Sequence, residues 1–382
     1  MEINNYLENL KKDGLFRKRK ILSSAQGATI SIGDKKFLNF SSNDYLGFAN
    51  NEELKQQMIE AINRYGIGAG SSQLISGYAE PHARLEKKLA KFFNKKSALI
   101  FSSGYHANLA ISSALINKNT IIFQDKFNHA SLIDAALLSK GKLVRYRHHD
   151  VMHLKSLFEK YKGKEFVVMT DGVFSMDGDR APLMEITELC STYSALLIVD
   201  DAHGIGVLGK KGAGLVEEVG LEKKVDLLIG TFGKSFGASG AFVVGDETII
   251  EAFIQKARTY IYTTALLPSL AATITHTLKM MKESDNLRTH IKELIADYKK
   301  LSTKAGILSS KSDGHIQPLI IGDAYKTMQI SKALYQKKIL VSAIRPPTVP
   351  KNTSRLRISI TAGHTKKDIL LLVKTISKVL NA

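Results

Sequence analysis

Short apolar segments alternate with helical patterns through the middle of the chain, and this alternation limits the possible folds more than any other feature. The segments lie at residues 97–101, 120–123, 142–146, 166–169, 195–199, 225–230 and 241–244. Apolar segments of this length, separated by helices, are typical of βαβ units around a parallel sheet. The sequence therefore predicts an α/β fold with a mostly parallel central sheet and helices on both faces.

The pattern changes along the chain and predicts three regions. Residues 1–45 form an arm, in which an amphipathic helix is followed by a short hairpin over residues 28–40. Residues 46–270 carry the alternation and predict a large domain. Residues 271–382 begin with a long helical pattern and continue with short apolar segments and further helices, which predicts a small α+β domain.

The chain has 382 residues and a formal net charge of +18. Such a charge favours anionic ligands, such as coenzyme A, an acidic carrier protein, phosphate or nucleic acid, although a lysine-rich solvated surface gives the same number. The dense basic cluster at residues 17–20 stands without a zinc finger, an aromatic RNA-binding box or a basic zipper. We therefore expect no nucleic-acid partner.

Cys190 is the single cysteine, which excludes an internal disulfide and a cysteine-cluster metal site. Its helical context predicts packing in the core. No apolar segment approaches the ~18 residues of a membrane helix, and the first residues do not match a secretory signal. We expect a cytoplasmic enzyme without a membrane partner.

Reactive side chains follow two of the apolar segments. Asp200 and His203 come at the end of one, and Lys234 follows the other among small residues. Ligands of open α/β sheets bind at the carboxyl ends of the strands, so these groups are expected to share a crevice. An amine, an acid and an imidazole suit pyridoxal 5'-phosphate (PLP), because lysine forms its Schiff base and an aspartate keeps its pyridine nitrogen protonated.

Three further segments end in groups that suit the same cofactor. Gly104 and Tyr105 open a helix whose N–H groups can hold a phosphate, and the tyrosine ring can stack. His129 can cover a planar ring, and Ser175 can donate a hydrogen bond. Taken singly, each has an ordinary alternative as a turn, capping or packing residue.

Two other sites fit less well. Residues 204–209 match the dinucleotide pattern GxGxxG, but the residues that follow them do not easily open a helix beneath a pyrophosphate. Asp200 and His203 lack the third clustered ligand of a usual zinc set. We expect neither a dinucleotide nor a metal.

Four motifs resemble those of a known family: residues 39–47 (NFSSNDYLG), 173–179 (VFSMDGD), 200–204 (DDAHG) and 231–234 (TFGK). Through these motifs the chain resembles the α-oxoamine synthases, PLP enzymes of fold type I (aspartate aminotransferase-like), over nearly its whole length. The resemblance implies decarboxylative condensation of an amino acid with an acyl thioester. It also implies a homodimer with active sites at the subunit interface.

Residues 343–350 (AIRPPTVP) favour one branch of this family. That branch joins L-alanine to a pimeloyl thioester, carried by coenzyme A or by acyl-carrier protein, in biotin biosynthesis. Three alternatives stay open: a family member that joins glycine to acetyl-CoA, a transaminase of the same fold, and a non-catalytic subunit of the PLP fold.

The resemblance also implies roles for individual residues around the cofactor. Lys234 would form the Schiff base and act as general base, and Asp200 would pair with the pyridine nitrogen. His203 and Ser175 would hydrogen-bond the ring oxygen, while His129 would stack on the ring face. The phosphate would be held by Gly104, Tyr105, Thr231 and, from the second subunit, Thr263 or Thr264.

Substrate contacts are implied in the same way. Arg345 would bind a substrate carboxylate, and Thr348, Asn43 and Arg17 would help to place the substrates, as would His129. A small alignment shift would give the role of Arg17 to Arg19.

Overall fold

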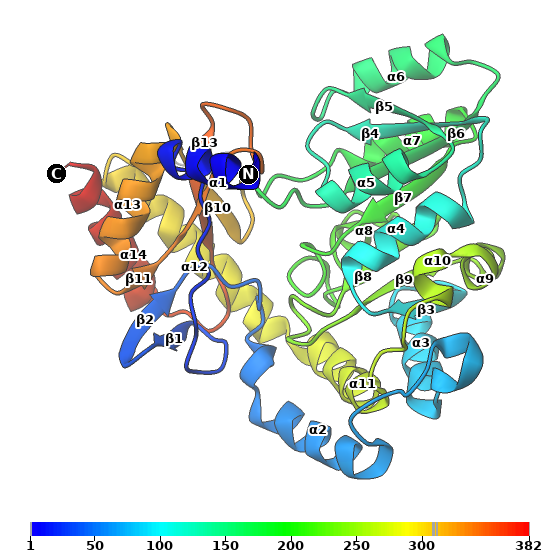
Figure 1. Cartoon of the computed structure of the whole chain (residues 1–382), viewed down its shortest axis with the longest axis horizontal. Helices are drawn as coiled ribbons and strands as arrows, with labels where there is room; N and C mark the ends of the chain where they lie inside the picture. Colours follow the sequence, from blue (N-terminus) through cyan, green and yellow to red (C-terminus); the bar gives the residue numbers. More distant parts are fainter. Residues whose placement is uncertain (1, 308–309, 311, 382) are drawn as a thin grey trace. The chain divides into compact units, whose positions relative to one another are not determined.

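The structure is a computed structural model that describes residues 2–307, 310 and 312–381 of the chain. It divides into two compact units. The large unit contains Asn51–Phe174 and Arg180–Asp285; the small unit contains the residues up to Asn50, the segment Ser175–Asp179 and the residues from Asn286 onward. Figure 1 labels the elements of both units. The division into an arm and two domains stays a prediction.

A seven-stranded sheet forms the centre of the large unit (Figure 1). In spatial order its strands are β3 (Ser97–Phe101), β9 (Ala241–Gly245), β8 (Leu227–Thr231), β7 (Leu196–Asp200), β6 (Glu165–Asp171), β4 (Thr120–Asp125) and β5 (Lys142–Tyr146). Neighbouring strands are parallel, except that β9 runs antiparallel to β3 and β8. The predicted mostly parallel fold is confirmed, although the apolar pattern did not reveal the reversed direction of β9.

Helices connect these strands and cover the sheet. Every residue of β4 and β9 is buried, which is typical of strands that are covered on both faces. The helices of the large unit include α2 (Glu52–Tyr65), α3 (Glu80–Phe92), α4 (Gly104–Ala114), α5 (Ala130–Leu138), α6 (Val151–Lys160), α7 (Leu183–Thr192), α8 (Leu215–Glu218), α9 (Glu247–Lys256), α10 (Arg258–Ile261) and α11 (Pro268–Glu283).

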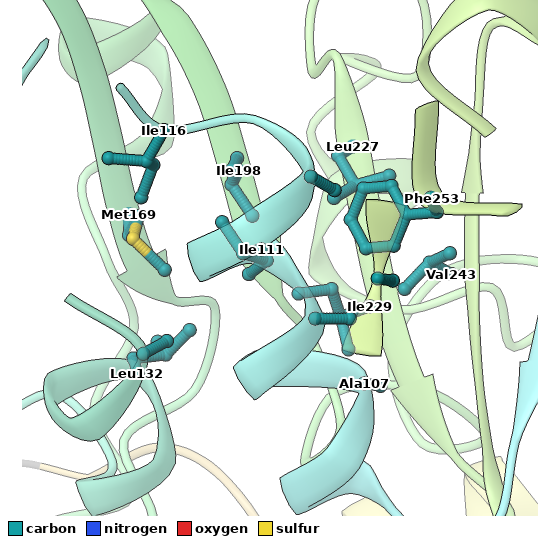
Figure 2. Packing of buried hydrophobic residues seen from close by; sticks show 14 of the residues in the cluster. Ala107, Ile111, Ile116, Leu132, Met169, Ile198, Leu227, Ile229, Val243 and Phe253 are labelled. Atoms are coloured by element: carbon teal, nitrogen blue, oxygen red, sulfur yellow. The ribbon is translucent and has the colours of Figure 1, made fainter. Parts of the chain in front are cut away.

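The core of the large unit fixes α4 against the sheet. Ala107 and Ile111 of α4 belong to one buried cluster with Ile198 of β7, Ile229 of β8 and Val243 of β9 (Figure 2). The small alanine side chains of α4 face this cluster one helical turn apart, so the helix backbone can approach the strands closely. This packing fixes the position of the amino-terminal turn of α4.

The small unit contains two short sheets. A hairpin of β1 (Thr29–Ile32) and β2 (Lys35–Asn39) turns at Gly33, whose φ of +56° lies in the region that glycine tolerates. Its other strands are β11 (Ile339–Leu340), parallel to β2, and the antiparallel set β10 (Ile316–Gly322), β13 (Ser354–Ser359) and β12 (Ser342–Ile344). Its helices include α1 (Glu2–Lys12), α12 (Asp285–Lys304), α13 (Ala324–Gln336) and α14 (Lys366–Leu380).

Two expectations about single features can be compared with the structure. Cys190 on α7 is only 4% exposed and forms no disulfide, and burial raises the pKa of its thiol to about 12, as suits core packing. Within the described residues, no helix combines the length and the apolar character needed to cross a membrane.

Candidate active site

Three neighbouring strands end in polar side chains at the same edge of the sheet. β6 ends at Asp171, β7 at Asp200 and β8 at Thr231, and Asp171 lies opposite Asp200 in the strand register. Because the three strands are parallel, their carboxyl ends meet where open α/β sheets bind ligands. A cavity of about 170 Å³ opens there.

The cavity gathers most of the cofactor residues that the sequence predicted. Its lining includes Gly104, Tyr105, His129, Asp200, His203, Thr231 and Lys234. Ser175 belongs to the small unit, and Thr263 and Thr264 are not among the described residues that line the cavity.

Asp200 is held in a fixed orientation by neighbouring donors. The residue is 8% exposed. One oxygen accepts a hydrogen bond from Asn108 Nδ2 at 2.7 Å, and the other accepts from the backbone N–H of Ala202 at 3.1 Å. Asn108 Nδ2 also donates to Ser131 Oγ at 2.8 Å, which ties α4 to α5 beside the carboxylate. The carboxylate is thus positioned before any ligand arrives.

A second carboxyl lies next to Asp200. Burial raises the pKa of Asp171 well above its usual range, and the neighbouring negative charge of Asp200 adds to the shift. Asp171 Oδ2 accepts a hydrogen bond from the backbone N–H of His129 at 2.7 Å. Asp171 therefore braces the start of α5, and its raised pKa makes it more readily protonated than an ordinary aspartate.

His129 stands at the start of α5. Its Nδ1 lies 2.7 Å from Ser131 Oγ, so the ring is oriented by a side chain of the first helical turn. The ring reaches the open cavity, yet the surrounding protein desolvates it, and this desolvation lowers the pKa of the His129 imidazole. The opposing charges of Asp200 and Lys234 also act on this imidazole, in opposite directions. The arrangement favours a neutral ring at the cavity.

Lys234 is presented by a loop with a buried frame. Phe232 and Phe236, both at most 1% exposed, pack edge to face with their ring centres 5.1 Å apart. Ser235 Oγ donates to the backbone oxygen of Ile205 at 2.7 Å. Since the residues on both sides of Lys234 are anchored, the loop offers its side chain to the cavity at low entropic cost.

The opposite end of the cavity suits an anion. Gly104 begins α4, and the preceding Ser103 caps the helix by accepting from the His106 N–H at 3.2 Å. A Cβ on Gly104 would lie 3.7 Å from Thr231 Cβ, so the helix start and the end of β8 are in close approach. Free N–H groups and the positive helix end attract phosphate oxygens.

These residues fit PLP on the structure's own chemistry. The start of α4 beside Thr231 would suit the phosphate, Asp200 the pyridine nitrogen, His129 the ring face and Lys234 the aldehyde, and all of these residues line the one cavity. A further sign is the buried Oδ1 of Asn108 in the cavity wall, which has no hydrogen-bond partner among the described residues. A ligand with a donor would satisfy it.

The predicted substrate residues lie in the small unit. Arg345 is 8% exposed, and its guanidinium donates to the backbone oxygen of Gly14. Burial, and then the like charge of Arg17, lower the pKa of Arg345, so the two arginines are neighbours. Thr348 is exposed, and its N–H donates to the Arg345 oxygen at 3.1 Å. Arg19 is exposed as well.

Arg357 of β13 is a buried cation that the sequence analysis missed. It is 6% exposed and donates to the Ser175 backbone oxygen at 2.6 Å, to Asn43 Oδ1 at 3.1 Å and to Ser359 Oγ at 2.8 Å. It also reaches Tyr45 Oη at 3.4 Å. Within the described part of the chain its acceptors are all uncharged. A buried guanidinium without a carboxylate partner is suited to bind an anion.

Asn108, Ser131 and Asp171 were also missed. Asp171 lies two residues after an apolar segment, and Asn108 lies one helical turn after Gly104, so both positions carried a signal. Arg357 alternates with apolar residues in its strand, a pattern that predicts an exposed side chain, so nothing in the sequence indicated its burial. The GxGxxG pattern has a different cause: a Cβ on Gly204 would lie 2.0 Å from Asp201 Oδ1, and α8 begins only at Leu215.

Comparison with known proteins identifies the family. The profile described as "Aminotransferase class I and II" matches residues 35–376. The chain is 44% identical over 373 residues to 8-amino-7-oxononanoate synthase of Marinobacter nauticus, covering 97% of this chain and 94% of that protein. It is 44% identical over 369 residues to the same enzyme of Hahella chejuensis, covering 96% and 93%.

Solved structures agree. Serine palmitoyltransferase from S. paucimobilis, which holds PLP joined to myriocin, superposes with a TM-score of 0.94 at 28% identity, covering 100% of this chain and 97% of that one. The 8-amino-7-oxononanoate synthase from Francisella tularensis gives a TM-score of 0.79 at 34% identity, covering 90% and 98%.

The chain therefore belongs to the class I and II aminotransferase family, with the architecture of a PLP-dependent enzyme of fold type I. Within that family it is a member of the α-oxoamine synthases, grouped with the 8-amino-7-oxononanoate synthases. The predicted family and fold are confirmed.

Proposed function

We propose that the chain condenses L-alanine with a pimeloyl thioester and gives 8-amino-7-oxononanoate, carbon dioxide and the free thiol, as a step of biotin biosynthesis. The observation that carries the proposal is the cavity where Lys234, Asp200 and His129 converge at the carboxyl edge of the sheet. Full-length relatives of 44% identity that bear this enzyme's name support the choice of substrates.

PLP, when bound, supplies an electron sink that stabilises negative charge on the α-carbon of the amino acid. Asp200, already oriented by Asn108 and Ala202, holds the proton on the pyridine nitrogen that makes this sink effective. The start of α4 and Thr231 would bind the phosphate and so position the cofactor in the cavity. The imidazole of His129, whose pKa is lowered by desolvation, would cover the ring and exclude water from it.

Lys234 has two tasks in this scheme. Its Nζ would hold the cofactor's aldehyde covalently and, when free, would accept the α-proton of alanine as general base. The α-carbon then attacks the thioester carbonyl and expels the thiol. The substrate carboxylate then leaves as carbon dioxide, and one proton returns to the α-carbon, which gives the product.

The substrate carboxylates need cationic partners. Arg345 with the neighbouring Arg17, and the buried Arg357 with Asn43, are two candidate receptors in the small unit. Ser175 is assigned to the ring oxygen together with His203. We assign Thr263 and Thr264 to the cofactor phosphate of a second subunit in a homodimer, in keeping with their absence from the cavity lining of the described chain. We place the activity in the cytoplasm, where the thiol of Cys190 stays reduced.

Release of free thiol by the PLP-loaded protein tests the proposal. Pimeloyl-CoA and pimeloyl-carrier protein are each supplied with L-alanine, glycine or L-serine. We expect release with L-alanine and one or both acyl donors. Preference for glycine or serine would move the chain to another α-oxoamine synthase activity, and transfer of the amino group to a keto acid without thiol release would favour a transaminase.

A further inference from the structure

A second and larger cavity lies in the large unit between α3 and α11. Its volume is about 610 Å³, within the range of small-molecule sites. Lys88 and Lys91 come from α3, Lys279 and Lys282 come from α11, and Lys211 comes from the loop before α8. We call it the basic cavity.

The charge of the basic cavity is one-sided. Seven of its twelve lining residues are basic and none is acidic among the described residues. Arginine and lysine make up 54 of 382 residues of the chain, whereas they make up six of these twelve, so the cavity is enriched well beyond a generally lysine-rich surface.

Nearby carboxylates neutralise only part of this charge. Arg84 pairs with Glu80 at 2.6 Å, and His276 pairs with Glu53 at 2.6 Å. The five lysines are exposed, and none of them has an ion-pair partner in residues 2–307, 310 and 312–381. Unpaired like charges around one cavity repel one another, and a multiply charged anion removes that repulsion.

The basic cavity also has an apolar side. Phe92 at the end of α3 is half-buried, and Ala272 and Leu278 of α11 lie beside it in the lining. Lysine ammonium groups bind phosphate oxygens as point charges, and an aromatic face accepts a stacked base. The lining therefore offers cations for phosphate groups and an aromatic face for a ring, which are the two parts of a phosphorylated ring compound.

The basic cavity is separate from the candidate active site. α3 ends at Phe92, just before β3 begins at Ser97, so its last turns lie near the amino ends of the parallel strands. Lys95 accordingly donates to the backbone oxygen of Val225, just before β8 begins. The candidate active site occupies the opposite edge, and the two cavities share no lining residue among those described.

We propose that the basic cavity binds a nucleoside polyphosphate, with its phosphates among the five lysines and its base against Phe92. A free nucleotide and the nucleotide portion of coenzyme A both carry this chemistry. The site lies outside the one that carries the proposed reaction, so the ligand acts as an effector and not as a reactant.

Calorimetric titration of the PLP-loaded chain tests this proposal with four probes: ATP, coenzyme A, inorganic tripolyphosphate and adenosine. PLP is kept bound so that its own phosphate site is filled. We expect ATP, coenzyme A or both to bind at one site per chain, at least about tenfold more tightly than tripolyphosphate, because stacking of a base contributes ~1–3 kcal/mol. Adenosine alone should not bind measurably.

Two matched double variants locate the site. Lys88→Glu with Lys91→Glu alters the basic cavity, while Lys87→Glu with Lys96→Glu alters exposed neighbours outside its lining by the same change of net charge. The first pair should weaken binding by at least about tenfold, as expected for the loss of two phosphate contacts, and the second by much less.

Four results would overturn the proposal. One is that neither ATP nor coenzyme A binds, even if an acidic protein does. Another is equal weakening by both double variants, which would assign binding to the general positive field. The third is tripolyphosphate binding as tightly as ATP, which would remove the base from the recognition. Coenzyme A binding that survives Lys88→Glu with Lys91→Glu, when ATP does not bind, would place it in the active site and would count against the proposal too. Thiol release by the Lys88→Glu with Lys91→Glu variant is also measured without nucleotide. This measurement distinguishes a failure of nucleotide binding from a failure of the proposed reaction.

Discussion

Lys234 owes its position to its neighbours, because Phe232 and Phe236 bury the loop on either side of it. Lys234→Ala leaves this frame intact and removes the proposed anchor and the proposed base together. We expect thiol release to fall by at least ~10²–10⁴-fold, the usual contribution of a positioned proton acceptor. Borohydride reduction should no longer attach the cofactor to the chain. Lys96→Ala, on an exposed residue, is the control, and near-normal turnover of the Lys234 variant would refute the assignment.

The two arginine receptors can be told apart by kinetics. Arg357→Gln removes a buried guanidinium whose described partners are uncharged, whereas Arg345→Gln removes one that adjoins Arg17. If Arg357 takes the carboxylate of alanine, Arg357→Gln raises KM for L-alanine by about 10–100-fold, equivalent to ~1.5–3 kcal/mol for a hydrogen bond to a charged group. KM for the acyl donor should change far less. Thermal unfolding of both variants controls for lost structure, and unchanged KM for alanine would leave Arg345 as the receptor.

Asp201 predicts a pH dependence of stability. It is fully buried, and burial raises the pKa of its carboxyl to about 8. The folded chain therefore keeps a proton that the unfolded chain releases above about pH 4, and stability from this group is lost as pH rises from about 4 to about 8.

Asp201→Asn, which replaces the protonated carboxyl with an amide of similar shape, should remove this loss. Between about pH 5 and about pH 8, the free energy of unfolding of the native chain should fall by ~2–4 kcal/mol more than that of the variant. Urea unfolding at both pH values measures it, with Asp34→Asn in the exposed β1–β2 turn as the control. Parallel pH profiles for native chain and Asp201→Asn would contradict the prediction.

At the scale of elements, α4 connects core packing to the cofactor site. Ala110 on its buried face has no exposed surface. Ala110→Leu must push the helix away from the sheet, with an expected loss of about 1–3 kcal/mol in the free energy of unfolding. The displaced start of α4 should also weaken PLP binding, which equilibrium titration of the apoprotein measures. Destabilisation with unchanged PLP affinity would show that the helix start is held by its cap alone.

The elements also show what a sequence pattern can and cannot predict. The seven apolar segments became the seven strands of the sheet, because continuous burial of a strand leaves a local signature. The antiparallel direction of β9 has no such signature, since an antiparallel and a parallel strand in a covered sheet carry the same residues. Arg357 escaped for a related reason: its partner Ser175 lies 182 positions away, so only the folded chain reveals their contact.

At the scale of the whole molecule, the net charge of +18 bears on substrate capture. Pimeloyl-CoA is a polyanion, whereas alanine is a zwitterion without net charge, so the positive field speeds the approach of the acyl donor only. Salt screens this field, with a Debye length of about 10 Å at about 0.1 M. Raising KCl from about 0.05 M to about 0.5 M should therefore lower kcat/KM for pimeloyl-CoA by about tenfold. KM for L-alanine should change by less than about twofold.

The salt dependence of kcat/KM also distinguishes the effect of the overall positive field from an effect of the basic cavity. Because that cavity lies at the edge opposite the candidate active site, it adds to the overall charge but does not line the site where the acyl donor reacts. Lys88→Glu with Lys91→Glu should then alter the salt dependence of kcat/KM no more than Lys87→Glu with Lys96→Glu, since both pairs remove the same charge. A selective loss in the first pair would mean that the cavity takes part in donor capture, and an equal salt response of both substrates would mean that the field does not steer the acyl donor at all.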